Sequence, residues 1–110
     1  MKKERYKTEQ EKLEAVKKYG GAILDIHNPS EAVQLEAVKK YGEAIQYIPN
    51  PSEAVQLAAV KQDGYAIRYI PNPSEAVEFY IKSNYPDIYK EYFEEESIKW
   101  NPNKLKQTIK

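Results

Sequence analysis

The chain has 110 residues and no net charge, with 41% apolar and 31% charged residues, a size and composition typical of one ordered domain in water. Because cysteine is absent, disulfides, thiolate metal sites and a cysteine nucleophile are excluded, and a reducing compartment is expected. No apolar run approaches the roughly 20 residues that span a bilayer, and the charged start is unlike a signal peptide, so we expect a cytoplasmic protein.

The neutral total conceals an uneven distribution of charge. Residues 73–97 carry seven acidic residues against two lysines, whereas residues 98–110 carry four lysines and no acidic residue. The sequence therefore predicts an acidic third quarter, typical of a solvated helix, followed by a basic tail.

One hexapeptide, Asn-Pro-Ser-Glu-Ala-Val, organises the chain. It begins at residues 28, 50 and 72, so it recurs every 22 residues. A fixed short period indicates a repeat array in which each unit packs against its neighbours. We divide the single domain into a degenerate first unit at 7–28, further units at 29–50, 51–72 and 73–101, and a cap at 102–110.

Each full unit is predicted to begin with a long helix. Asparagine is a favoured N-cap, proline is tolerated at the first helical position, and glutamate two residues later can reach back to the cap. Gly42 and Gly64 each follow a repeat proline by 13 residues, where a left-handed glycine would end the helix. The pattern thus predicts asparagine caps, a helix of about 13 residues and a glycine stop.

A short second helix is predicted after each glycine. In residues 43–48 and 65–70, an alanine and two isoleucines share one face, and a proline follows. In the long helix before it, small apolar residues spread around the circumference, which predicts burial on more than one side. These residues are Ala54, Val55, Leu57, Ala59 and Val60.

The last unit departs from this schedule. Pro86 takes the glycine position, and Asn101-Pro102 arrives 29 residues after Pro73 rather than 22. The seven extra residues equal about two helical turns. We therefore predict a lengthened second helix from Pro86 to about Ser97, followed by a short closing helix.

Leucine-rich repeats share a period of this length, but they need leucines at close, strand-like spacing. Only five leucines occur in the chain, and the helix-start signals favour helices instead. The predicted fold is all-α: a small α-solenoid of about four stacked helical hairpins, with a lengthened penultimate helix and a short C-terminal helix.

The unit also resembles a family of short helical repeats in bacterial and phage proteins that is catalogued as a domain of unknown function. Residues 57–70, with the sequence LAAVKQDGYAIRYI, carry the resemblance, and residues 35–48 follow closely. The resemblance covers roughly residues 9–85. It implies all-α repeats and a link to mobile elements, but it transfers no activity and no site residues.

No constellation in the sequence points to catalysis. The single histidine, His27, is predicted to lie in a loop, and the sequence near it does not indicate the nucleophile or orienting group that a general base uses. The repeat serines are expected to assist helix capping, and consecutive glutamates at 94–96 would point in different directions around a helix, which disfavours a metal site. We expect a protein that is not an enzyme and needs no cofactor or metal.

Positions that vary between units while the core stays constant mark candidate binding surfaces. On the short helices, Tyr65 and Arg68 occupy such positions, and Tyr47 and Tyr69 flank the buried face. Tyrosine and arginine are favoured interface anchors. The interpretation that Tyr47 and Tyr69 merely pack between hairpins stays equally open. A line of lysines on the long helices, Lys17, Lys39 and Lys61, is explained by compensation of the helix dipoles.

The lengthened helix offers a second candidate surface. Its acidic residues are Asp87, Glu91, Glu94 and Glu95, and Trp100 follows them. Such an edge could engage a basic groove of another protein, although a solubilising cap explains most of the same residues. The most specific hypothesis is a phage or mobile-element inhibitor that covers the basic nucleic-acid-binding surface of a host defence protein.

Two other classes of function stay open. Lysines and tyrosines could bind RNA or another single-stranded nucleic acid directly, as helical repeats can. The neutral charge disfavours this class, because binding to the nucleic-acid backbone requires neutralisation of several phosphates. The other class is self-association, and the sequence does not predict an oligomeric state.

Overall fold

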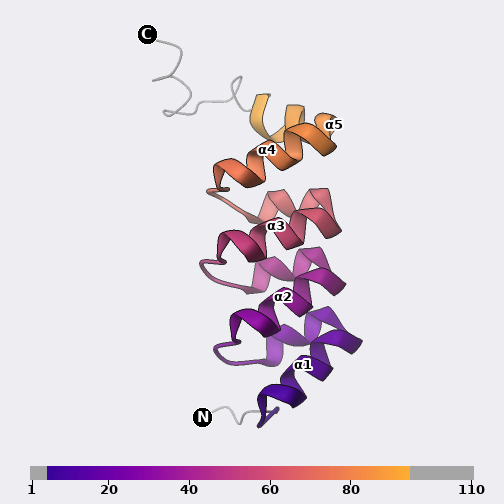
Figure 1. The fold of residues 1–110 in the computed structure, drawn as a ribbon, viewed down its shortest axis with the longest axis vertical. Coiled ribbons are helices and arrows are strands. Elements are labelled where there is room, and N and C mark those ends of the chain that lie inside the picture. The colour runs from indigo at the N-terminus through magenta and orange to yellow at the C-terminus, as the bar shows by residue number, and fades with distance from the viewer. Residues whose placement is uncertain (1–4, 95–110) are drawn as a thin grey trace.

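The computed structural model describes residues 5–94, which form an all-α array without strands (Figure 1). Long helices alternate with short ones, which confirms the predicted solenoid of stacked helical hairpins. The elements are α1 (Glu9–Lys18), η1 (Gly20–Asp25), α2 (Glu31–Lys40), η2 (Gly42–Tyr47), α3 (Glu53–Gln62), η3 (Gly64–Tyr69), α4 (Glu75–Asn84), α5 (Pro86–Tyr89) and η4 (Lys90–Glu94). The predicted short helices η1, η2 and η3 are of the 3₁₀ type.

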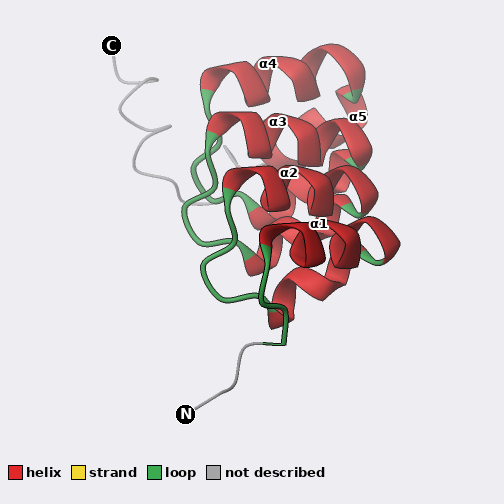
Figure 2. Cartoon of the chain, turned by 60° about the horizontal axis from the view of Figure 1, so that its bottom comes forward, coloured by secondary structure: helices red, strands yellow, loops and turns green. Residues whose placement is uncertain are grey.

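The hairpins stack along the long axis of the molecule, from α1 at one end to α5 at the other (Figure 1). Figure 2 shows α1 to α4 side by side in one layer, with the loops gathered at one edge. Each of these long helices contacts the next, and η2 contacts both η1 and η3 in a second layer. The long and short helices therefore present two different outward faces.

The core lies between the two layers and repeats from unit to unit. In the third unit, the buried apolar residues are Val55, Ala59 and Val60 in the long helix, Ala66 and Ile67 in the short helix, and Ile70 directly after it. Burial is restricted to one side of the long helix, because Ala54 is exposed and Leu57 is only half-buried. Of the five residues predicted to be buried on more than one side of this helix, Ala54 is therefore outside the core, while Leu57 is partly buried against it.

Serine, rather than asparagine, caps the repeated long helices. The hydroxyl oxygen of Ser52 accepts the backbone N–H of Val55 at 3.3 Å, and the corresponding serines of α2 and α4 make the same bond at 3.2 Å. The helix consequently has ten residues, not 13. Asn50 instead adopts a φ of 52°, a left-handed conformation that asparagine tolerates better than most residues. The predicted caps are wrong by two residues.

The repeat glycines are needed for close approach between units rather than for a left-handed turn. None of the described glycines has a positive φ, and α2 ends at the extended residue Tyr41. A Cβ atom on Gly42 would lie 2.6 Å from the carbonyl oxygen of Ala59 in the next unit, and one on Gly20 would lie 2.7 Å from that of Ala37. The predicted glycine stop is therefore wrong, and a side chain here would separate the hairpins.

The second helix of the last unit is longer than its counterparts, as predicted. It runs as an α-helix from Pro86 to Tyr89 and continues as a π-helix to Glu94. Its inner side packs against the core through Ile88, Tyr89, Tyr92 and Phe93. The predicted helix end near Ser97 and the closing helix at 102–110 lie outside the described residues.

Candidate functional site

The short-helix layer carries a cluster of aromatic and charged side chains on and beside η2 and η3. We name it the tyrosine–arginine face, and it consists of Tyr41, Glu43, Tyr47, Tyr65, Arg68 and Tyr69. The repeat brings these residues together, because Glu43 and Tyr65 occupy equivalent positions in successive units, as do Tyr47 and Tyr69. Four of the predicted partner-binding residues therefore lie on one surface.

Arg68 connects two adjacent units of this face. Its guanidinium group donates to Glu43 Oε2 at 2.6 Å and lies 4.9 Å from the centre of the Tyr69 ring. The hydroxyl group of Tyr41 donates to the other carboxylate oxygen of Glu43 at 3.3 Å. Sequence reasoning missed this link. The signal for it is a separation of 25 residues, one repeat period plus roughly one helical turn.

The electrostatics of the face follow from these contacts. Partial removal from water acts to lower the pKa of Arg68, but the neighbouring Glu43 carboxylate together with Tyr69 and Tyr92 outweighs this effect, and the pKa is raised overall. Partial removal from water also raises the pKa of the Tyr41 phenol, and the hydrogen bond to Glu43 raises it further. Arg68 is thus charged and held in one orientation, and the Glu43 carboxylate compensates its charge.

The tyrosines of the face differ in exposure. Tyr65 is 46% exposed and Tyr47 is 39% exposed, whereas Tyr69 is half-buried and packs against the core. The interpretation that a tyrosine packs between hairpins therefore applies to Tyr69, whereas the side chains of Tyr47 and Tyr65 are largely accessible to water.

The acidic residues predicted as a second surface lie at the far end of the array. Asp87, Glu91 and Glu94 are exposed on α5 and η4, while the aromatic residues of the same segment are half-buried. Glu95 and Trp100 lie outside the described residues. We name the three described acids the acidic edge.

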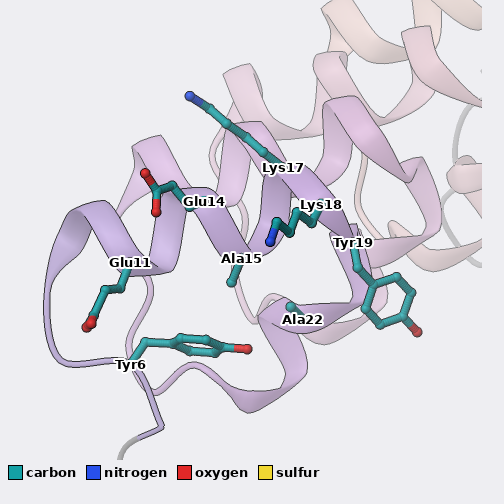
Figure 3. Close-up of a pocket in the computed structure, with 8 residues that line it drawn as sticks. All are labelled: Tyr6, Glu11, Glu14, Ala15, Lys17, Lys18, Tyr19 and Ala22. Carbon is teal, nitrogen blue, oxygen red and sulfur yellow. The ribbon is translucent and has the colours of Figure 1, made fainter.

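At the opposite end, an open hollow of about 740 Å³ faces water beside α1. Figure 3 shows Tyr6 beneath α1, with its ring beside Ala15 and Ala22. Ala37 and Ala59, which are equivalent to Ala15, are fully buried, whereas Ala15 is half-buried because no described unit precedes it. The hollow is therefore the stacking face of an end unit, partly covered by Tyr6.

The histidine and the repeat serines, which were considered as catalytic candidates, lie in a loop and at helix N-termini. His27 is exposed in a loop, and its Nε2 lies 3.2 Å from the side-chain nitrogen of Asn28. The repeat serines accept helix N–H groups as caps. Within residues 5–94, no group of three or more metal-ligating side chains is placed to hold an ion, and no helix is long and apolar enough to cross a membrane.

A third surface, on the long-helix layer, was not predicted from the sequence. A shallow groove of about 520 Å³ runs between α2 and α3. We name it the long-helix groove, and its main lining residues are Leu35, Lys39, Ala54, Leu57, Ala58 and Lys61. The repeat contains a signal for this surface, because the same long-helix position holds an apolar residue every 22 residues. It is occupied by Leu13, Leu35 and Leu57, which are half-buried, and by Phe79, which is 71% exposed.

Known protein families, curated proteins and solved structures contain no significant match to this chain. The resemblance to the bacterial and phage repeat family therefore stays a prediction.

Proposed function

We propose that this protein is a non-enzymatic helical-repeat module that binds another protein through the tyrosine–arginine face. The observation that supports this most is the exposure of Tyr47 and Tyr65 beside an arginine that is already fixed by Glu43 and Tyr69. Tyrosine and arginine contribute strongly to interfaces. An anchor that is held in place before binding loses less conformational freedom on association.

The arrangement of the lysines favours a protein partner over a nucleic acid. Lys39 and Lys61 lie on the long-helix groove, whereas the tyrosines of the tyrosine–arginine face lie on and beside the short helices. Those tyrosines and these lysines therefore do not form one continuous surface. Within the tyrosine–arginine face, Glu43 compensates Arg68. Binding to a nucleic-acid backbone requires several uncompensated cations, and this face does not supply them.

Site-specific photo-cross-linking tests the proposal. A photoreactive amino acid is placed at Tyr65 in one protein and at Glu53, an exposed residue of the long-helix layer, in another. We expect a discrete protein adduct from position 65 that disappears when Arg68→Ala is added. Equal adducts from both positions, or an adduct indifferent to Arg68→Ala, would contradict binding through this face.

The inhibitor hypothesis is a more specific version of the same proposal and depends on the acidic edge. Exposed carboxylates at Asp87, Glu91 and Glu94 would complement a basic groove on a host protein. The test is capture of a nucleic-acid-binding protein from bacterial lysate by the wild-type chain and by a variant with Glu91, Glu94 and Glu95 reversed to lysine. Unchanged capture by the variant would count against this version.

A further inference from the structure

The long-helix groove lies between one pair of helices, α2 and α3. Its floor consists of Leu35 from α2 and Leu57 from α3, both half-buried, with Ala54 and Ala58 beside them. Single half-exposed leucines are ordinary on protein surfaces. Here two leucines and two alanines adjoin, and they form a continuous apolar depression.

The repeat shows why the depression opens between these helices. The position of Ala58 is occupied by Glu14 and Glu36 in the preceding units and by Tyr80 in the following one. In the space between α3 and α4, the Tyr80 ring is half-buried, and Lys61 Nζ lies 5.7 Å from its centre. A single small residue, Ala58, therefore leaves room in α3 where the other units place a large side chain.

The charge at the rim has one sign. Lys39 and Lys61 are exposed at the edge of the groove, and the residues that line it include no carboxylate. Among residues 5–94, no carboxylate lies within 4 Å of either lysine, although Lys61 Nζ lies over the Tyr80 ring. Apolar area next to two exposed lysines complements a segment that combines a large apolar side chain with carboxylates.

We propose that the long-helix groove binds an acidic amphipathic segment of a partner protein. One large apolar side chain of that segment enters between Leu35 and Leu57 over Ala58, and its flanking carboxylates pair with Lys39 and Lys61. This is the helix-in-groove mode of peptide recognition. The groove belongs to the long-helix layer and shares no residue with the tyrosine–arginine face, so this inference stands independently of the proposed function.

The test is selection from a displayed library of random peptides of about 12–16 residues, three to four helical turns, followed by affinity measurement on the selected peptides. We expect enriched peptides in which glutamate or aspartate flanks a large apolar residue. Ala58→Glu should weaken their binding by about tenfold or more, the scale of an interface anchor. This variant restores the residue that Glu14 and Glu36 provide at the same position, so the fold should tolerate it.

The double variant Lys39→Glu, Lys61→Glu supplies a second measurement that leaves the groove floor intact, and it should also weaken binding by about tenfold or more. Arg68→Ala, on the other layer, should leave the affinity unchanged. The proposal is overturned if no peptide is enriched, if the enriched peptides lack acidic residues, or if Ala58→Glu binds them as well as the wild type. It is also overturned if these variants abolish dimerisation in sedimentation or binding of a single-stranded RNA, since a second copy or a nucleic acid would then be the occupant.

Discussion

The joints between units and the outward faces of the units follow opposite rules. At the joints, a glycine of one unit meets the backbone of an alanine in the next with no room for a methyl group, as Gly42 meets Ala59. On the outward faces, equivalent positions hold unlike residues, such as Glu43 and Tyr65. The difference teaches that the stacking restricts which residues can stand at the joints, while the outward faces can accept unlike residues.

The largest expected effect is that of a side chain inserted at a joint. Gly42→Ala should lower the free energy of unfolding by about 1–3 kcal/mol, the usual cost of overpacking a tight contact. The added Cβ would lie 2.6 Å from the backbone oxygen of Ala59, which cannot move without shifting α3. Urea denaturation followed by circular dichroism measures the change.

Gly21→Ala is the matched control, because Gly21 lies next to a joint glycine in the same kind of short helix. A Cβ at this position would meet the far end of the Tyr19 side chain, 2.6 Å away, and Tyr19 is exposed and free to rotate aside. We expect a change within about 0.5 kcal/mol. If both alanine variants lowered the free energy of unfolding equally, the joint would be no less tolerant of a side chain than the neighbouring position.

The second expected effect concerns the caps, which recur as faithfully as the joints. Ser52→Ala removes the acceptor for the Val55 N–H and should cost about 1 kcal/mol. Ser83→Ala, at an exposed position near the end of α4, should change stability by less than about 0.5 kcal/mol. Both values come from the same urea titrations. Similar losses for the two serines would contradict the assignment of Ser52 as the cap.

Much of the fold could be predicted because the repeat states the same local signals several times. The short helices and their buried alanine and isoleucines follow directly from spacing. The position of the cap could not be decided in this way. Asparagine and serine are comparably good N-caps, and the motif places them two residues apart, so Asn50 and Ser52 compete until the φ of each is known.

The candidate surfaces were predictable only where they depend on residue type. Tyrosines and an arginine at varying positions indicated the tyrosine–arginine face, but the contact of Arg68 with Glu43 depends on how successive units stack. The long-helix groove depends on which side of α3 meets its neighbour. Leu57 and Ala58 look like core residues by composition, and only the packed array shows that one side of the helix stays open.

The smallest expected effect distinguishes the last joint from the others. There the space beside Gly64 is closed by side chains, with Tyr85 Cδ2 and Ile88 Cδ1 each 2.9 Å from where a Cβ atom would lie. Partial removal from water raises the pKa of Tyr85, and the neighbouring Tyr80 raises it further. Partial removal from water likewise raises the pKa of Tyr89, and the neighbouring Glu78 carboxylate raises it further.

A phenol whose pKa is raised by folding stabilises the protein fully below its unfolded pKa of about 10, and this contribution is lost as the pH rises through the folded value. The urea midpoint should therefore fall above about pH 10, and it should fall less steeply in the double variant Tyr85→Phe, Tyr89→Phe. A double variant whose urea midpoint fell as steeply as that of the wild type would show that Tyr85 and Tyr89 do not cause the alkaline loss of stability.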